Sequence, residues 1–448
     1  MVNMAELPKY ENYKDSNIEW LKEIPVDWSV ERFHHVFRFA KGLNITKENL
    51  QDEGILCVNY GEVHSKYSFE LDTSIHALKY VDASYLKYNK KSLVKHSDFI
   101  FADTSEDLEG SGNFTYLKSD EEIFAGYHTL IARLKYKRNE RYLAYVLESM
   151  SFRLQVRRAV KGVKVYSITQ NILKSTKIWF ATEQEQSLIA KFLDNKTLQI
   201  NKVIEYKQQQ INLLKERKQI IIQKAVTQGL DANVPRKDSG VSWIGKIPEH
   251  WEIRRSKFLF TQRKEKALND DVQLSATQAY GVIPQEKYEA LTGKRVVKIQ
   301  FHLDKRKHVE KDDFVISMRS FQGGLERAWS CGCIRSSYVV LKALQTIDPL
   351  FYGYLLKLPS YIAALQQTAS FIRDGQDLNF DNFSRVDLFI PPLEEQTAIA
   401  NYVESFLTSS DEAMNLIEQQ IEKLKEYKTT LINSAVTGKI KITPEMVE

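Results

Sequence analysis

The sequence predicts an α/β (α+β) fold in two copies, with two long antiparallel coiled-coil helices between the globular parts and a pseudo-twofold relation between the halves. Three observations lead to this prediction. The helical phrase "LLKERKQIIIQKAVTQG" at 213–229 returns as "KLKEYKTTLINSAVTGK" at 423–439. A second phrase opens each half, as "DSNIEWLKEIPVDW" at 15–28 and "DSGVSWIGKIPEHW" at 238–251. The stretches between these repeated phrases are unlike one another.

The helical repeat keeps a constant offset of 210 residues. Over 208–227 and 418–437 the two copies agree at 11 of 20 positions without a gap, and Glu185-Gln186 matches Glu395-Gln396 in the same register. A repeat of this length indicates two pseudo-symmetric halves, because a solenoid needs three or more shorter units.

Apolar residues recur every seven positions in both copies, which is typical of a coiled-coil seam. The residues expected to pair the helices are Ile200, Ile204, Ile211, Leu214, Ile221, Met414, Ile417, Ile421, Leu424 and Leu431. Residues 189–225 contain neither Pro nor Gly. At about 1.5 Å per residue they would form a helix of about 55 Å.

Local signals mark the ends of both helices. Thr182 with Glu185 forms a capping-box pattern, and Pro391-Pro392 precede the second helix. Gly229 and Gly438 follow the two helices as C-caps.

The apolar seam of each helix needs a second helix to cover it, and the other copy of the repeat is the nearest one. An antiparallel pair is favoured because it relates the halves by a twofold axis. A plain dimerisation coiled coil is the alternative. Lys218 and Lys428 hold equivalent seam positions, and we expect their ammonium groups to reach the surface.

The globular stretches 30–180 and 253–390 mix short β-like runs with helical ones. Their charge differs from that of the C-terminal region. Residues 245–390 carry a net charge of +5 and residues 391–448 a net charge of −5. The basic region could contact phosphates, whereas the acidic one would repel them. Solvated surface charge is the alternative interpretation.

Several classes of protein are disfavoured. No secretion signal and no 18-residue uncharged apolar run occurs, so we expect a cytoplasmic protein without a membrane partner. Cys57, Cys331 and Cys333 lack the second ligand pair of a structural zinc site, so we expect no metal. The sequence lacks Walker A, GxGxxG, HExxH and GxSxG motifs, and "IPPL" at 390–393 fails the methyltransferase pattern at both ends. An enzyme is therefore disfavoured.

Taken together, the paired "IPxxW" openings, "EQ" helix starts and "AVT" endings resemble the specificity subunit of type I restriction-modification systems over essentially the full length. "LSATQAYGVIP" and "DFVISMRSFQGGLERAWSCGCIRSSYVV" support the resemblance in the second half. The first half departs from the pattern, because "WFATEQEQ" lacks the proline expected before the helix. The implied domains are target-recognition domains at 1–182 and 231–392, a central spacer helix at 183–230 and a C-terminal spacer helix at 393–448.

The resemblance implies a non-catalytic subunit that binds double-stranded DNA. Each recognition domain would read one half of a bipartite site, and the helices would set the gap between the halves. Two methyltransferase subunits would dock on the helices and carry S-adenosylmethionine, so this chain itself would bind no cofactor. Nuclease-translocase subunits would join the full complex.

Polar side chains beside predicted strands are the expected base readers, because Arg and Lys suit guanine and Asn and Gln suit adenine. In the first domain these are Lys41, Asn44, Thr46, Asn59, Tyr60, Thr104 and Ser105, with Arg157, Lys161 and Lys164 on phosphates. In the second they are Ser275, Thr277, Gln278, Tyr280, Arg319, Ser320 and Gln322, with Arg263, Lys264 and Arg373 on phosphates. His128 is expected to be a buried structural histidine.

Two alternatives stay open at this point. The chain could serve a fused type II methyltransferase-nuclease, or it could be a coiled-coil adaptor that does not bind DNA. The partner found in a pull-down would distinguish the first alternative, and sequence-dependent protection of DNA would distinguish the second.

Overall fold

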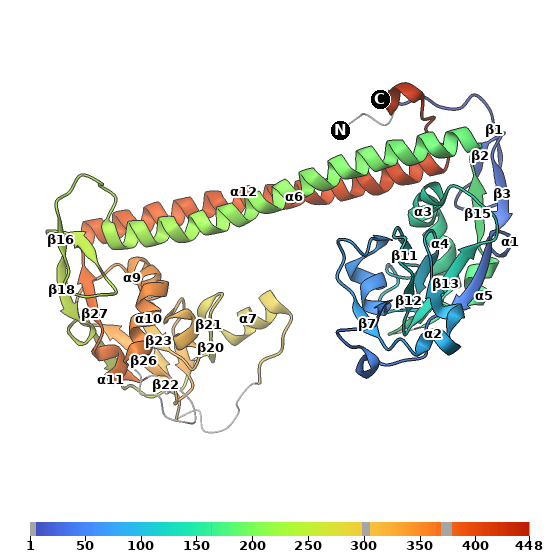
Figure 1. Ribbon diagram of the computed structural model, residues 1–448. Helices are drawn as coiled ribbons and strands as arrows, with labels where there is room; N and C mark the ends of the chain where they lie inside the picture. Colours follow the sequence, from blue (N-terminus) through green and yellow to red (C-terminus); the bar gives the residue numbers. More distant parts are fainter. Residues whose placement is uncertain (1–5, 163, 298–304, 369–378, 448) are drawn as a thin grey trace. The chain divides into compact units, whose positions relative to one another are not determined.

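The computed structural model describes residues 6–447, apart from residue 163 and the segments 298–304 and 369–378. The chain divides into two compact units (Figure 1). Unit 1 comprises residues 1–207 and 418–448, and unit 2 comprises residues 208–417. Each unit contains one globular region and parts of two long helices, α6 (Glu183–Gln228) and α12 (Leu393–Val436).

The globular part of unit 1 is built on two sheets. The larger has the order β4 (Phe37–Lys41), β13 (Thr129–Leu134), β9 (Phe99–Ala102), β11 (Phe114–Leu117) and β6 (Phe69–Leu71). The smaller has the order β7 (Lys79–Val81), β5 (Ile55–Val58), β12 (Ile123–Ala125) and β8 (Leu93–Val94).

Strand β9 is buried on both faces because each face meets a different layer. Phe99 and Phe101 pack with α3 (Glu140–Glu148) and α4 (Met150–Ala159), whereas Ile100 and Ala102 pack toward the smaller sheet. This alternation is the period-2 pattern of a strand. The remaining elements of the globular part are α1 (Phe33–Val36), α2 (Tyr85–Tyr88), α5 (Gln170–Ser175), β1 (Tyr13–Asp15), β2 (Glu23–Pro25), β3 (Ser29–Arg32), β10 (Thr104–Ser105), β14 (Tyr166–Ser167) and β15 (Lys177–Phe180).

Unit 2 repeats this plan with a smaller sheet. Its order is β19 (Phe260–Arg263), β26 (Val339–Ala343), β23 (Phe314–Ile316) and β24 (Glu326–Arg327). Two antiparallel pairs flank it, the hairpin of β20 (Leu274–Thr277) with β21 (Gly281–Pro284) and the pair of β22 (Lys307–Val309) with β25 (Gly332–Ile334). The other elements are α7 (Gln285–Thr292), α8 (Ser320–Gly323), α9 (Pro349–Leu355), α10 (Pro359–Gln367), α11 (Phe380–Ser384), β16 (Arg236–Asp238), β17 (Lys246–Pro248), β18 (Glu252–Arg255) and β27 (Asp387–Ile390).

The repeated "IPxxW" and "EQ" phrases meet in both units. The Trp28 indole donates to the Glu185 carboxylate at 3.2 Å in unit 1, and the Trp251 indole donates to Glu395 at 2.9 Å in unit 2. Glu185 also completes the predicted capping box, since its carboxylate accepts from the Thr182 backbone N–H at 3.2 Å and its own backbone N–H donates to the Thr182 hydroxyl oxygen at 3.4 Å. The start of a long helix is thereby tied to the globular region beside it.

The neighbouring glutamines secure the chain entering each helix. The side-chain amide of Gln186 donates to the Ala181 carbonyl, and that of Gln396 donates to the Pro391 carbonyl, both at 2.8 Å. Both glutamines are buried. Each one satisfies a carbonyl that would otherwise lack a partner in the interior.

The helix ends pack on the same tryptophans. Gly438 has a φ of +71°, and a Cβ there would lie 2.4 Å from Pro25 Cδ, so only glycine fits. Gly229, with a φ of +74°, packs against Trp251 in unit 2. In each unit, therefore, the start of one long helix and the end of the other pack against the globular region.

Within each unit the two helices run antiparallel, as predicted. In unit 1, Lys207 Nζ donates to Gln420 Oε1 at 2.6 Å; in unit 2, Lys218 pairs with Asp411 Oδ1 at 2.5 Å. Residues earlier in α6 therefore meet residues later in α12. Of the predicted pairing residues, Ile200, Ile211, Ile417, Ile421, Leu424 and Leu431 are buried, and Ile204, Leu214, Ile221 and Met414 are half-buried.

The two seam lysines are half-buried, and the ammonium group of each bonds to a polar partner across the pair. Lys218 bonds to Asp411, and Lys428 Nζ donates to Asn201 Oδ1 at 2.9 Å. Asp411 and Asn201 are themselves equivalent positions of the repeat. The same polar contact thus occurs once in each unit, with a carboxylate in one and an amide in the other.

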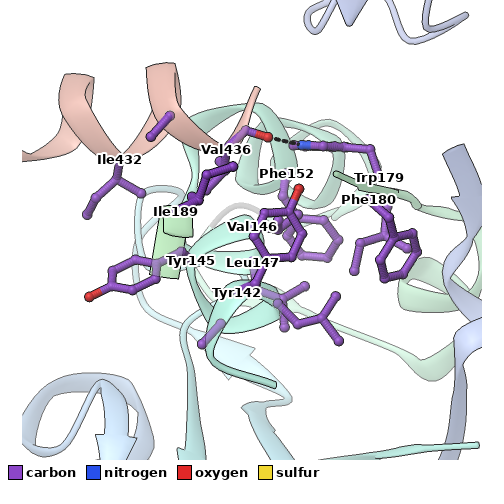
Figure 2. Close-up of a cluster of buried hydrophobic side chains, with 14 of the residues drawn as sticks. Tyr142, Tyr145, Val146, Leu147, Phe152, Trp179, Phe180, Ile189, Ile432 and Val436 are labelled. Carbon is purple, nitrogen blue, oxygen red and sulfur yellow. Dashed lines mark hydrogen bonds between the residues drawn. The ribbon is translucent and has the colours of Figure 1, made fainter. Parts of the chain in front are cut away.

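A first prediction concerns the core beneath the end of α12. Figure 2 shows the fully buried Trp179 donating its indole N–H to the Val436 carbonyl, at 2.5 Å. Trp179→Phe leaves this carbonyl without a partner and opens a small cavity. We expect a loss of about 2–3 kcal/mol of unfolding free energy, measured by denaturant titration.

The matched control is Trp20→Phe in the same unit. Trp20 is half-buried, and its indole nitrogen has no hydrogen-bond partner among the described residues. This substitution should cost clearly less, and equal losses for the two variants would contradict the role of the bond to Val436.

A second prediction concerns Lys428. Burial lowers the pKa of its ammonium, so the charged form is disfavoured in the folded state. This cost is fully present below the folded pKa and disappears as the pH rises toward the unfolded value of about 10.4. Lys428→Met should therefore raise stability by about 1 kcal/mol at pH 7, and the gain should shrink in alkaline buffer.

Lys218→Met is the control, because it removes an ammonium that a carboxylate compensates. We expect no gain from it in thermal unfolding measured across pH. A loss of stability in Lys428→Met as large as that in Lys218→Met would show that the Asn201 contact outweighs the cost of burial.

Candidate nucleic-acid interface

One hollow of unit 2 lies beside the β20–β21 hairpin. It has a volume of about 1050 Å³ and is walled by the hairpin, α7, the start of α8 and the loop after β25. We refer to it as the unit 2 cleft. Six of the predicted base readers line it: Ser275, Thr277, Gln278, Tyr280, Arg319 and Gln322.

The unit 2 cleft is basic. Lys294, Arg295, Arg319 and Arg335 line it, and no Asp or Glu is among its described lining residues. Within the described part of the chain, none of the three arginines has a carboxylate at ion-pair distance. The described residues therefore leave these charges uncompensated, so this surface attracts anions and is suited to phosphate contacts.

Sequence reasoning missed several residues of this surface. Arg295, Arg335 and Tyr288 line the cleft alongside the predicted ones, as do the buried Arg306 and Gln285. The basic run "GKRVVK" at 293–298 was the available signal for Arg295. The two buried residues carry no signal in the sequence, because only the fold brings them to the cleft.

Ser320 lies behind this surface. Its side chain is fully buried, and its hydroxyl accepts from the Ser317 backbone N–H at 2.9 Å, which holds the turn that presents Arg319. Arg373 falls outside the described residues. Lys264 is exposed.

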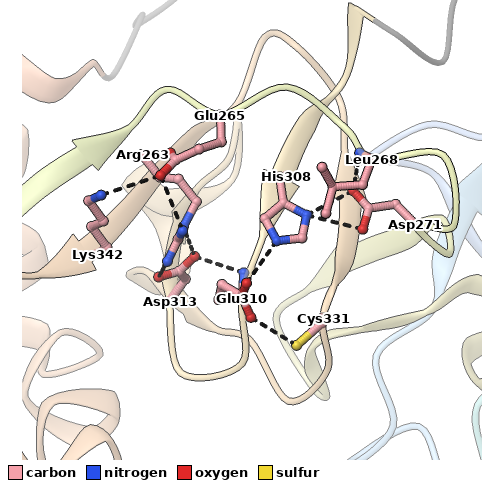
Figure 3. A network of polar contacts seen from close by, with 9 residues as sticks. All are labelled: Arg263, Glu265, Leu268, Asp271, His308, Glu310, Asp313, Cys331 and Lys342. Carbon is pink, nitrogen blue, oxygen red and sulfur yellow. Dashed lines mark hydrogen bonds and ion pairs between the residues drawn. The ribbon is translucent and has the colours of Figure 1, made fainter.

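Arg263 belongs to a network inside unit 2, shown in Figure 3. Its guanidinium contacts the buried Asp313 carboxylate at 2.6 and 3.1 Å. Beside it, His308 lies between Asp271, at 2.8 Å, and Glu310, at 2.9 Å. Burial works against a charged imidazole, but the two carboxylates outweigh it and raise the pKa of His308. Arg263 thus has a partner within the domain, and its side chain is only 14% exposed.

A second hollow shares the turn of the same hairpin, at Ala279 and Tyr280, with the cleft. It has a volume of about 630 Å³ and is lined by Tyr280, Gly281, Trp329, Leu350 and Tyr354, among others. The buried Glu326 carboxylate at its wall lies 2.8 Å from the Lys357 ammonium.

The equivalent place in unit 1 is filled by an internal charge cluster. Arg141 lies on α3 and is the counterpart of Leu350 on α9 of unit 2. Its guanidinium contacts the carboxylates of Glu70 and Asp194, the latter at 2.6 Å. Its guanidinium also lies over the ring of Phe69, 5.0 Å from the centroid. In unit 2, Leu350 stands in the place of Arg141, whereas Glu404 keeps the carboxylate of Asp194.

The predicted readers of unit 1 divide into exposed and buried groups. Lys41, Asn44 and Thr46 are exposed, and Tyr60 and Thr104 are half-buried. The side chains of Asn59 and Ser105 are buried; the Ser105 hydroxyl donates to the Asp107 carbonyl at 2.6 Å and lies 3.1 Å from His64 Nε2. These two hold the loops that present their neighbours.

His128 is not buried as expected. Its side chain is 60% exposed, and Nδ1 lies 3.1 Å from Asp103 Oδ1. The residue adopts a φ of +56° in the turn before β13, which directs the ring outward. The Tyr60 ring lies 6.5 Å from it and 5.0 Å from His64, so sequence reasoning missed a His-Tyr cluster at this edge.

The predicted phosphate contacts of unit 1 also differ in exposure. Lys161 and Lys164 are exposed. Arg157 is half-buried, and its guanidinium donates to the Glu109 carbonyl at 2.6 Å. The DNA-contacting roles of all these residues stay predictions.

None of the helices in the described ranges is long and apolar enough to cross a membrane.

The chain is similar to curated proteins over nearly its full length. It is 25% identical over 458 residues to a putative type I restriction enzyme MjaX specificity subunit of Methanocaldococcus jannaschii, covering 99% of this chain and all of that protein. It is 24% identical to the type I restriction enzyme MjaVIII specificity subunit of the same organism, covering 99% of each chain.

Solved structures share the fold. A chain from work on complex assembly and conformational transition of the type I R-M system aligns with a TM-score of 0.64 at 14% identity, covering 92% of this chain and 98% of that one. The HsdS subunit from Thermoanaerobacter tengcongensis aligns with a TM-score of 0.51 at 13% identity, covering 93% and 98%.

The model of the type I restriction modification DNA specificity domain matches residues 25–213 and 248–423, one match for each half of the repeat. These matches span well over half of the chain, and the chain therefore belongs to the family of type I restriction-modification specificity subunits.

Proposed function

We propose that this chain reads a bipartite DNA site for a type I restriction-modification complex. Each unit reads one half of the site, and the paired helices fix the gap and hold two methyltransferase subunits. The main support is the repeated frame, in which unlike surfaces are attached to the same Trp-carboxylate helix junction. A duplicated frame with two different surfaces suits two different sequences.

The chain acts in this proposal as a recognition subunit without chemistry of its own. S-adenosylmethionine is carried by the methyltransferase subunits, and nuclease-translocase subunits join them for cleavage. The acidic region 391–448 suits docking of proteins, since it would repel a DNA backbone.

In unit 2 the cleft is the proposed reading surface. Arg319 and Gln322 lie at the start of α8, next to the β20–β21 turn that carries Gln278. Gln278 Nε2 donates to the Arg319 carbonyl at 3.4 Å, which links the turn to the helix. Arginine and glutamine on this surface suit guanine and adenine edges respectively.

The main experiment maps methylated adenines in cells that express this chain with its methyltransferase partner. A two-part motif with a constant gap is expected. A continuous motif would favour the fused methyltransferase-nuclease alternative, and no sequence-dependent methylation would favour the adaptor.

One prediction tests the cleft. The double substitution Arg319→Ala with Arg335→Ala should weaken binding of target DNA by the complex about tenfold or more, and lower the salt dependence of log K by about 1–2. Fluorescence anisotropy across a salt series measures both quantities.

Arg255→Ala with Arg385→Ala is the matched control, because it removes the same charge from exposed positions of unit 2 outside the cleft lining. If the two double variants weakened DNA binding equally, the loss would come from the overall charge of unit 2 and not from the cleft.

Another prediction tests the gap. Seven residues inserted after Lys207 and seven after Ile417 keep the seam in phase and lengthen each helix by about 10 Å. The gap in the methylated motif should then grow by about three base pairs, with both half-sequences unchanged.

The same insertion after Asp231, in the turn that follows α6, is the control and should leave the motif as it was. If the paired insertion left the gap in the methylated motif unchanged, this would contradict the proposal that the helices set that gap.

A further inference from the structure

Two buried polar atoms at the unit 2 cleft have no partner among the described residues. Arg306 is 5% exposed, and its Nη2 donates to the Cys333 carbonyl at 3.3 Å, but its Nε meets no hydrogen-bond acceptor in the described part of the chain. Gln285, which begins α7, is 7% exposed, and within the same described ranges its Oε1 accepts no hydrogen bond. Both side chains line the cleft. Buried polar groups are normally satisfied, so this pair indicates a ligand that brings one acceptor and one donor.

The side chains that line the cleft indicate the chemical class of the ligand. Tyr288 and Tyr338 are half-buried and line the cleft, and the exposed Tyr280 packs edge-on against Tyr288 at 6.4 Å between centroids. Tyrosine rings beside a groove are the usual stacking partners of nucleobases. The uncompensated arginines at 295, 319 and 335 suit a phosphate.

A phosphate alone does not fit these groups, because it has no donor for Gln285. A base that stays in the duplex does not fit them either. Its edge lies at the floor of a groove, and a side chain must project outward to reach it. The side chains of Arg306 and Gln285 are buried instead, so a base can reach them only by leaving the duplex.

We propose that the unit 2 cleft takes up one nucleotide swung out of the DNA duplex. Its base edge bonds to Arg306 and Gln285, its ring stacks on the tyrosines, and its phosphate lies against the cleft arginines. This inference rests on the proposed function, since it assumes that unit 2 reads DNA. Extrusion is the known way for a recessed protein site to reach a base, and stacking on aromatic rings offsets the lost base stacking.

The test uses the complete chain with its methyltransferase subunits and a duplex that carries the methylated motif. 2-Aminopurine replaces one base at a time in and beside the half-site of unit 2. The adenine that becomes methylated is omitted, because the methyltransferase itself would extrude it. Fluorescence should rise at least threefold on binding at one position and stay quenched at the others.

Variants connect this signal to the cleft. Gln285→Leu and Arg306→Met should each abolish the rise, whereas Gln285→Glu, which keeps acceptor oxygens, should retain part of it. Circular dichroism and methylation at the half-site of unit 1 report whether a variant is still folded. A rise that persists in folded Gln285→Leu would overturn the proposed role of the cleft.

The failure of this inference is separate from that of the proposed function. A two-part methylated motif together with quenched probes at every position overturns the extruded nucleotide and leaves the reading role intact. Titration of the complex with free deoxynucleoside monophosphates, without DNA, examines the other source of the same ligand. Arg306-dependent binding in that titration, together with quenched probes in the duplex, would assign the cleft to a free nucleotide and overturn the DNA source.

Discussion

The structure depends on a carboxylate at the start of each long helix. Glu185 and Glu395 lie where free backbone N–H groups and the helix dipole stabilise a negative charge, and each accepts from a tryptophan indole of the globular part. In unit 1 the same carboxylate also caps the helix through Thr182. The helix start and the globular fold therefore support one another, and neither can loosen without weakening the other.

This junction accounts for what the sequence could predict. Caps, seams and repeated phrases depend on residues close together in the chain, so periodicity and spacing are enough to find them. The antiparallel arrangement followed from the same repeat, and contacts such as Lys218 with Asp411 confirm it.

The candidate site was harder to predict because its features depend on distant residues. In the sequence Arg263 looks like Arg319, but Asp313, 50 positions further on, neutralises only the former. Gln285 begins α7 and Arg306 lies just before β22, and only the fold brings both to the cleft. The outward position of His128 depends on a left-handed backbone conformation, which is uncommon for any residue other than glycine and which the sequence around it does not signal.

The two units show how one frame supports different surfaces. The tryptophans, glutamates, glutamines and terminal glycines of the frame are outside the lining of the cleft. The reading surface can therefore change while the junction stays the same. Arg141 in unit 1, compared with Leu350 in unit 2, shows such a change next to a tyrosine contact that both units have, in which Tyr145 bonds to Asp194 and Tyr354 to Glu404.

That difference has a steric consequence. The turn of the β20–β21 hairpin, at Ala279 and Tyr280, lines both hollows of unit 2, whereas the corresponding place in unit 1 is occupied by the Arg141 cluster. Unit 2 therefore has open volume on this surface that a bound group can fill, and in unit 1 the same group would first have to break the ion pairs of Arg141.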